Sequence, residues 1–257
     1  MARTVSSTLV APVVSVSANG VYYRDLNALL RNLVARGEKR IELRDVHGQR
    51  YIGTGLEAEV DIEIFGTPGN DLGAFMDGPR ITVRGNAQDG CGNTMNNGII
   101  AIHGHAGDIT GFAMRGGKIF VRDDVGYRVG IHMKQYLEKK PCLVIGGTAQ
   151  DFLGEYMAGG ILVVLGLGLK DGERHKASFI GTGMHGGVMY IRGPVENHQL
   201  GKEVGVVELD EGDWLTLRGL VDEYCSHFGY RKEEILSSRF LKLLPLSSRP
   251  YGRLYAY

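Results

Sequence analysis

The chain has 257 residues, enough for one large domain or two small ones with a sizeable core. Lysine and arginine number 29, as do aspartate and glutamate, so the net charge is zero and no overall basic surface favours nucleic acid or an anionic membrane. The 39 glycines are about twice the usual share, while only 7 prolines occur, which excludes a collagen-like or a Pro/Gly-rich disordered chain.

The N-terminal segment does not resemble a leader sequence. Its short apolar stretches are broken by serine and proline, and no later stretch approaches the roughly 18 uninterrupted apolar residues of a membrane span. Cys91, Cys142 and Cys225 are an odd set without CxxC spacing, so neither a disulfide framework nor a structural metal site is predicted. We therefore expect a cytoplasmic protein.

Residues 1–65 are predicted to form an N-terminal cap. A helix is expected over residues 23–35, because apolar side chains follow the i, i+3, i+4, i+7 spacing at Leu26, Leu29, Leu30 and Leu33. The next segment, KRIELRDV, has the pattern of a strand. Gly53 and Gly55 indicate one degenerate copy of the repeat that follows.

Residues 66–193 contain an internal repeat of glycine and methionine. In six successive copies a glycine is followed three residues later by a methionine, and the glycines are spaced by 19, 19, 19, 24 and 27 residues. The pairs are Gly73 and Met76, Gly92 and Met95, Gly111 and Met114, Gly130 and Met133, Gly154 and Met157, and Gly181 and Met184. We expect the methionines to be apolar filling rather than metal ligands.

Two apolar columns accompany the repeat, two residues apart as in a strand. One column comprises Ile81, Ile100, Ile119, Leu143, Leu162 and Met189, and the other Val83, Ile102, Val121, Ile145, Val164 and Ile191. A 19-residue unit is too short for a pair of helices, and strands related by translation lie parallel. Each copy is thus predicted to be one coil of a parallel β-helix, with both columns pointing inward and the glycines at corners.

Two charged insertions and a helical C-terminal region complete the chain. The insertions are KQYLEKKP at residues 134–141 and GLKDGERHK at residues 168–176. Loops on a rigid scaffold commonly carry contacts, so both are candidate sites for a partner or a small molecule. Residues 194–257 are predicted to cap the second end of the stack, with helices over Glu211–Phe228 and Arg231–Leu241, because an uncovered coil would recruit other chains.

The coils resemble a known family. GTAQDFLGEYMAGGILVVLG, followed by GTGMHGGVMYIRG, is closely similar to the C-terminal GXGXG domain of the glutamate synthase large subunit, over residues 66–193. The same coils resemble the subunit of formylmethanofuran dehydrogenase that contains this repeat. The resemblance implies an all-β, right-handed single-stranded parallel β-helix, here with helical caps at both ends. It also implies that the chain has no catalytic, cofactor-binding or metal-binding residues of its own.

By this resemblance the chain is a non-catalytic scaffold subunit of a glutamate-synthase-type complex, which makes glutamate from glutamine and 2-oxoglutarate. The chain opens Met-Ala-Arg, without the cysteine nucleophile of the glutaminase, and it lacks the FMN barrel and the iron–sulfur cysteines. Partner subunits of the glutaminase and FMN-synthase types are therefore expected to carry FMN and the iron–sulfur cluster, and self-association is left open. A scaffold like the repeat-containing subunit of formylmethanofuran dehydrogenase and a stand-alone carbohydrate-acting β-helix enzyme are the alternatives.

Several polar motifs are candidate sites. The segment from Gly181 to Gly186 satisfies GxGxxG, but a strand follows it instead of a helix, which favours a repeat corner over a dinucleotide site. His103 and His105 form HxH without an evident third ligand, which favours a hydrogen-bonded pair over a metal site. His132, His175 and His185 are expected to be polar neighbours of the insertions.

Four aspartates recur near the corners, at Asp71, Asp89, Asp108 and Asp151. Some polysaccharide-processing β-helices use carboxylates from adjacent coils for metal binding or acid/base chemistry. Recurrence at one place in the repeat instead favours hydrogen bonding to backbone N–H groups. We therefore predict a structural role for these aspartates.

Overall fold

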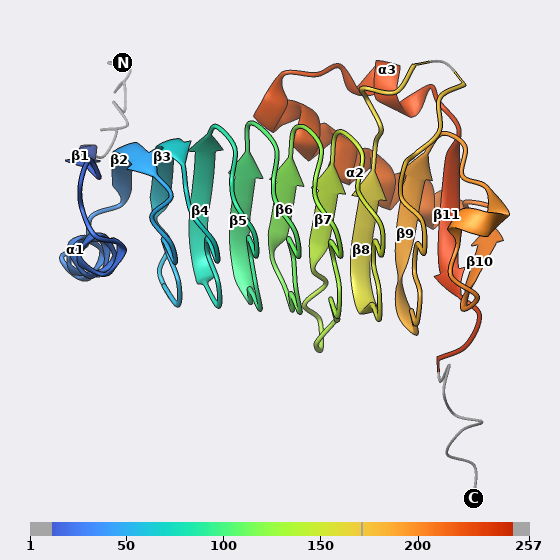
Figure 1. The fold of residues 1–257 in the computed structure, drawn as a ribbon, viewed down its shortest axis with the longest axis horizontal. Coiled ribbons are helices and arrows are strands. Elements are labelled where there is room, and N and C mark those ends of the chain that lie inside the picture. The colour runs from blue at the N-terminus through green and yellow to red at the C-terminus, as the bar shows by residue number, and fades with distance from the viewer. Residues whose placement is uncertain (1–11, 171, 249–257) are drawn as a thin grey trace, which may run out of the picture.

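The computed structural model describes residues 12–170 and 172–248, which wind into the predicted parallel β-helix (Figure 1). One sheet runs the length of the molecule in the order β1-β2-β3-β4-β5-β6-β7-β8-β9-β11-β10. Its strands are β1 (Val14–Ser17), β2 (Arg40–His47), β3 (Asp61–Thr67), β4 (Asp77–Arg84), β5 (Asn97–Ile102), β6 (Lys118–Val121), β7 (Cys142–Ile145), β8 (Ala158–Val164), β9 (Gly186–Arg192), β10 (Val204–Val207) and β11 (Phe240–Pro245). The helices are α1 (Tyr23–Ala35), α2 (Glu211–Phe228), α3 (Lys232–Leu236) and the 3-10 turn η1 (Asn197–Gln199).

The two apolar columns form continuous inner ladders. Each residue pairs in parallel register with its equivalent in the next coil, as Ile81 does with Ile100. All twelve side chains are at most 1 % exposed, which confirms that they point inward. Both ladders extend two coils further toward the N-terminus, through the pairs Ile41–Ile62 and Leu43–Ile64. The parallel stack therefore begins within residues 1–65, which the sequence suggested as a cap.

The glycine column is explained by the ladder that it faces. Gly92 has a φ of +68°, and a Cβ there would lie 2.3 Å from Cδ1 of Ile119 in the next coil. Gly130 has a φ of +71°, and its Cβ would lie 2.7 Å from Cδ1 of Leu162. Any side chain would thus combine a strained backbone with a collision. The six methionines of the repeat are fully buried and fill the same core.

Helix α1 covers the N-terminal end of the stack. Leu26 and Leu30 are 1 % exposed and join the ladder core, as the helical spacing predicts. The side-chain amide of Asn27 donates to the backbone oxygens of Tyr23 and Arg50, and so fastens the helix to the coil beneath it. Strand β1 pairs in parallel with β2 at the edge of the sheet.

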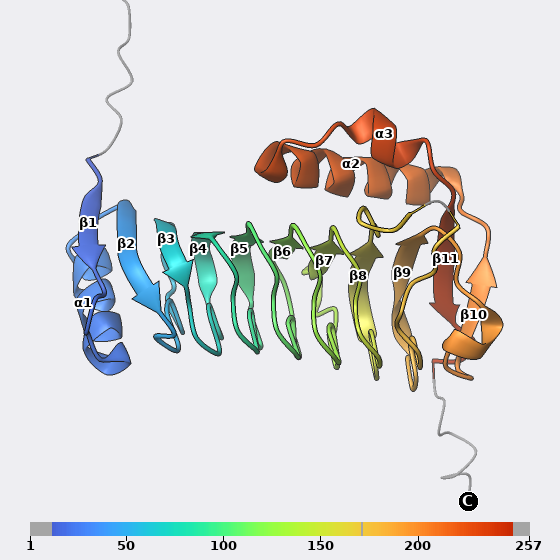
Figure 2. The same ribbon diagram turned by 45° about the horizontal axis from the view of Figure 1, so that its top comes forward.

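The C-terminal region combines a helix on the sheet with strands at its end. Helix α2 has the predicted bounds, with a capping box between Asp210 and Asp213 and a left-handed Gly229 at its C-terminus. It runs along the solenoid over the C-terminal half of the sheet (Figure 2). In the sheet, the strand next to β9 is β11, which pairs with it in antiparallel register. The outer ends of the two predicted caps, residues 1–11 and 249–257, lie outside the described residues.

The prediction of a helix over Arg231–Leu241 is wrong in its extent. Helix α3 ends at Leu236, and β11 begins at Phe240. Phe240 is 5 % exposed and packs in the layer beneath α2, whereas Leu243 is fully buried in the ladder core, so the two side chains lie on opposite faces of a strand that covers the open edge of β9. Across the described residues, none of the helices has the length and apolar character needed to cross a bilayer.

A candidate interaction groove on the sheet

The outer face of the sheet is divided into a covered and an open half. One outward-facing column reads Glu63, Thr82, Ala101, Phe120, Val144, Val163 and Tyr190 in parallel register from β3 to β9. From Phe120 onward the column is apolar, and helix α2 packs on it. Toward the N-terminus the column is polar or small. That half of the face is left open.

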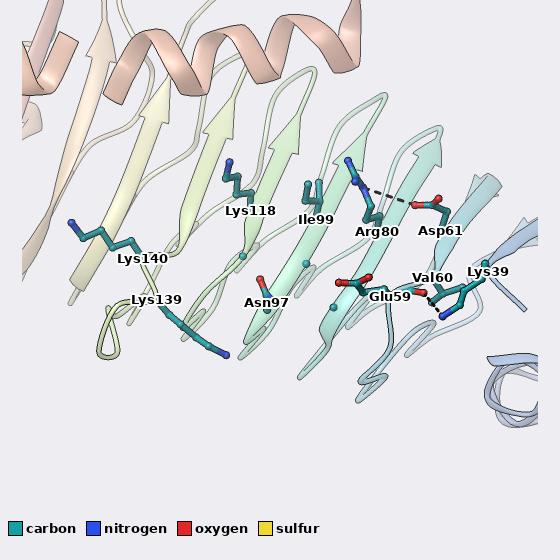
Figure 3. A pocket seen from close by; sticks show the side chains of 13 residues that line it. Lys39, Glu59, Val60, Asp61, Arg80, Asn97, Ile99, Lys118, Lys139 and Lys140 are labelled. Atoms are coloured by element: carbon teal, nitrogen blue, oxygen red, sulfur yellow. Dashed lines mark hydrogen bonds and ion pairs between the residues drawn. The ribbon is translucent and has the colours of Figure 1, made fainter. Parts of the chain in front are cut away.

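A groove of about 690 Å³ lies on the open half, near the starts of β3 to β6 (Figure 3). Its lining includes Gly98 and Gly117, which each lie two residues before the inner-ladder residue of their coil, and Gly78, which lies three residues before Ile81. All three have positive φ, and a Cβ on Gly98 would lie 2.3 Å from the backbone oxygen of Pro79. Because these positions admit no side chain, a hollow runs from coil to coil.

The insertion at residues 134–141 closes one end of the groove. It forms a small hairpin with a bridge between Tyr136 and Lys139. The hairpin lies against the next coil, since a Cβ on Gly159 would meet the backbone nitrogen of Gln135 at 2.3 Å. Lys139 and Lys140 are thereby placed in the groove wall (Figure 3). The insertion is thus part of a concave surface.

Basic residues outnumber acidic ones in the lining of the groove. Its basic residues are Lys39, Arg80, Lys118, Lys139 and Lys140, and its acidic residues are Glu59 and Asp61. Lys118 forms a close pair with Glu223 of α2, but two other pairs are long: Nε of Arg80 lies 3.9 Å from Asp61, and Nζ of Lys139 lies 3.4 Å from Asp77. Within the described part of the chain Lys140 has no ion pair. Such a surface attracts acidic groups and provides no nucleophile beside a base.

A smaller hollow of about 230 Å³ continues the open half beside the C-terminus of α2. Its wall includes Arg84, whose Nε lies 2.6 Å from Oε1 of Glu63. Nη1 of Arg84 lies 3.0 Å from Nε2 of His103, and the His103 ring meets Phe228 edge-on at 4.9 Å. Burial, followed by the charge of Arg84, lowers the pKa of His103. The His103 imidazole is therefore neutral at neutral pH, and it packs between the sheet and the C-terminal end of α2.

The two imidazole rings of the HxH motif contact different neighbours and do not form one site. His105 lies in the corner after β5, where its Nδ1 accepts the backbone N–H of Asp124 at 3.2 Å. His103 instead faces Arg84 and Phe228. Among the described residues no group of three or more His, Cys, Asp or Glu side chains is arranged to hold a metal ion. The structure therefore places both imidazoles in hydrogen-bonded or ring contacts.

The other three candidate histidines, His132, His175 and His185, also have local contacts. The His132 ring stacks on Tyr156 at 5.4 Å. His175 is buried at the second insertion, with Nε2 2.8 Å from the backbone oxygen of Arg192. Nδ1 of His185 lies 3.1 Å from the backbone oxygen of Gly183.

The corner aspartates accept backbone hydrogen bonds from the next coil, as predicted. Asp89 accepts from the N–H of Asp108 at 2.9 Å, and Asp151 from the N–H of Ser178 at 2.8 Å. Asp108 does the same for Tyr127. Asp71 is the exception, because it lies one position later in the coil, where it accepts from the side-chain amide of Asn93. Asp71 therefore does not belong to the column of aspartates that accept a backbone hydrogen bond from the next coil.

The GxGxxG segment lies in a repeat turn before β9. Gly181 has a φ of +70°, and its Cβ would lie 2.4 Å from Cγ2 of Val204. A strand follows at Gly186, so no helix N-terminus faces the turn. A repeat corner accounts for the motif.

The three thiols are free and buried. Burial raises the pKa of Cys91 to about 12 and that of Cys142 to about 11. Burial also raises the pKa of Cys225. None of them is therefore an activated thiolate.

The groove itself was missed at the sequence level. Lys39, Arg80 and Lys118 are far apart in the chain and were not singled out. One clue was available, because the outer column turns from polar to apolar at Phe120 while the inner columns stay apolar throughout. That change marks the strand from which α2 covers the outer face of the sheet.

Comparison with known proteins places these features in a family. The model of the GXGXG motif family matches residues 39–246. An uncharacterized protein of Methanocaldococcus jannaschii is 51 % identical over 250 residues, which cover 94 % of this chain and 96 % of that protein. The family match begins at β2, where the fully buried part of the inner ladders also begins.

Proposed function

Because the chain belongs to the GXGXG motif family, we propose that it is a scaffold subunit of a glutamate-synthase-type complex. In this proposal it has no catalytic residues of its own. It holds a glutaminase-type and an FMN-synthase-type subunit in register, and those partners carry FMN and the iron–sulfur cluster. The complex makes glutamate from glutamine and 2-oxoglutarate.

The observation that carries this proposal is the division of the sheet face. Helix α2 covers the apolar half, whereas the half that contains the groove is left open. The open half rests on fully buried ladders and fixed backbone turns, so it is a rigid surface. A rigid, concave surface on which basic residues outnumber acidic ones is suited to hold another subunit in a defined orientation.

Co-purification tests the scaffold role. The tagged full chain is isolated from its native source, and flavin absorbance and glutaminase activity are measured in the eluate. We expect both to elute with the chain at constant stoichiometry. The proposal fails if no flavin-containing or amidotransferase chain ever associates with it.

Charge reversal tests the groove as the contact. We expect the double variant Lys139→Glu and Lys140→Glu to weaken the association at least about tenfold, because two cations become anions facing the same partner surface. Lys202→Glu, on an exposed segment near β10, is the matched control. If the double variant and the control behave alike, the partner uses another face.

A carbohydrate-acting enzyme is the second candidate, because the groove follows the strand face and contains Glu59 and Asp61. Its test is an assay of the purified chain on polysaccharides. Turnover that is lost in Asp61→Asn would favour the enzyme over the scaffold.

A further inference from the structure

A second cavity, of about 620 Å³, lies toward the C-terminal end of the solenoid. Three segments that are distant in sequence line it: residues 166–170 and 172–173 at the second insertion, the end of β9, and the residues that lead into β11. The insertion is held against β9 by His175, whose Nε2 lies 2.8 Å from the backbone oxygen of Arg192. The cavity is therefore formed by the fold itself.

Each of the three segments contributes one cation to the lining: Lys170, Arg192 and Arg239. Among the described lining residues the acidic one is Glu173, and its Oε2 already accepts the backbone N–H of Lys170 at 3.0 Å. None of the three cationic side chains has an ion pair within residues 12–170 and 172–248. Among the described residues of the lining, three cations thus face one carboxylate.

Arg192 provides an independent observation. Its Nη1 donates to the backbone oxygens of Leu165 at 3.0 Å and Gly166 at 3.4 Å, which fixes the guanidinium. Its Nε is buried and has no hydrogen-bond partner, and in the described part of the chain no other buried side-chain nitrogen or oxygen is in this state. The guanidinium of Arg192, a residue that lines the cavity, is therefore fixed and carries a charge that no carboxylate in the described part of the chain neutralises.

We propose that this cavity binds a small organic anion through a phosphate or carboxylate group. The anion's oxygens accept hydrogen bonds from Arg239 and Lys170 and neutralise the charge of Arg192. Leu169 and Leu241 line the same cavity and offer an apolar surface to the rest of the ligand. This site is separate from the groove and does not depend on the scaffold role.

Calorimetric titration of the purified full chain with inorganic phosphate and with succinate, at low ionic strength, tests the proposal. We expect saturable binding of at least one probe, and the probe that binds identifies the preferred group. Arg239→Gln and Lys170→Gln should each weaken that binding about tenfold, because each removes one charged donor. Lys202→Gln is the matched control and should leave binding unchanged, since Lys202 is exposed and does not line the cavity.

Thermal unfolding of each variant establishes that it is folded. If one of the two variants is unfolded, the affinity of the other variant tests the proposal. The proposal is overturned if neither probe saturates at millimolar concentration. It is equally overturned if a probe binds but both variants retain the wild-type affinity.

Discussion

Along one outward-facing column of the sheet, Glu63 and Thr82 in the N-terminal half correspond to Val144 and Val163 in the C-terminal half. The inner ladders of both halves are equally apolar and equally buried. The difference teaches that the inward positions specify the coil, whereas the outward positions decide what covers it. The apolar half is covered by the chain's own helix, and the polar half stays available to another molecule.

The largest expected effect comes from the covered half. Phe120 is fully buried between the sheet and α2, so Phe120→Ala should lower the free energy of unfolding by about 3–5 kcal/mol. Thr82→Ala, at the equivalent outward position of the open half, should change it by less than about 0.5 kcal/mol. Urea denaturation of both variants measures the contrast. Equal losses would mean that α2 contributes little to the covered half.

The next effect concerns the anchor at the start of α2. Asp213 accepts hydrogen bonds from the Tyr190 hydroxyl at 2.6 Å and from Nζ of Lys242. Burial alone would raise the pKa of Asp213, but these hydrogen bonds lower it on balance. Asp213→Asn should cost about 1.5–3 kcal/mol at neutral pH, because charge-assisted bonds are lost.

The pH dependence of this anchor has a defined sign. Since the folded pKa of Asp213 lies below its unfolded value of about 3.9, the stabilisation is complete above that pH and is lost as the pH falls through the folded pKa. The gap in unfolding free energy between wild type and Asp213→Asn should therefore narrow in acid. A gap that is independent of pH down to the acid transition would contradict this assignment.

A smaller effect is expected at the boundary between the halves. Lys118 lies in the groove wall and pairs with Glu223 of α2, but its side chain is 40 % exposed. Lys118→Gln should lower the unfolding free energy by less than about 1 kcal/mol, and high salt should shrink the difference. A loss that is larger and unaffected by salt would show that the pair is screened from water.

The smallest expected effect is a change in the rate at which the buried thiols of the native protein are labelled. Cys142 lies on β7 beneath α2 and Cys225 lies on α2 itself, both in the layer between helix and sheet, whereas Cys91 lies in the ladder core. If α2 opens as a separate unit, Phe120→Ala should accelerate labelling of Cys142 more than that of Cys91. Equal acceleration at both thiols would mean that helix and coils unfold together.

The repeat made most of the fold predictable. Each coil repeats the same local conflict, in which the aliphatic ladder leaves no room for a Cβ at the glycine, as at Gly92 against Ile119. A constraint repeated at nearly fixed spacing is visible without coordinates. The structural role of Asp89 and Asp151 could be predicted for the same reason, whereas Asp71 was grouped with them only by proximity.

The groove and the second cavity could not be predicted in this way. Lys118 meets Glu223 across 105 residues of sequence, and Gly146 makes room for the Tyr224 hydroxyl, which donates to the backbone oxygen of Arg122 at 3.0 Å. Contacts of this kind occur once in the chain and have no period. The extent of the last helix was misjudged because Phe240 and Leu243 needed the edge of β9 as a partner.

The sequence by itself determined the coil, its inner ladders, its glycine turns and the helices α1 and α2, because these depend on spacing within a few tens of residues. Only the tertiary structure decided which half of the sheet α2 covers, where the hairpin of residues 134–141 ends the groove, and that Lys170, Arg192 and Arg239 meet around one cavity. The physical reason is that burial of a repeated ladder is a local requirement. The meeting of single charged side chains depends on how distant segments close over the finished solenoid.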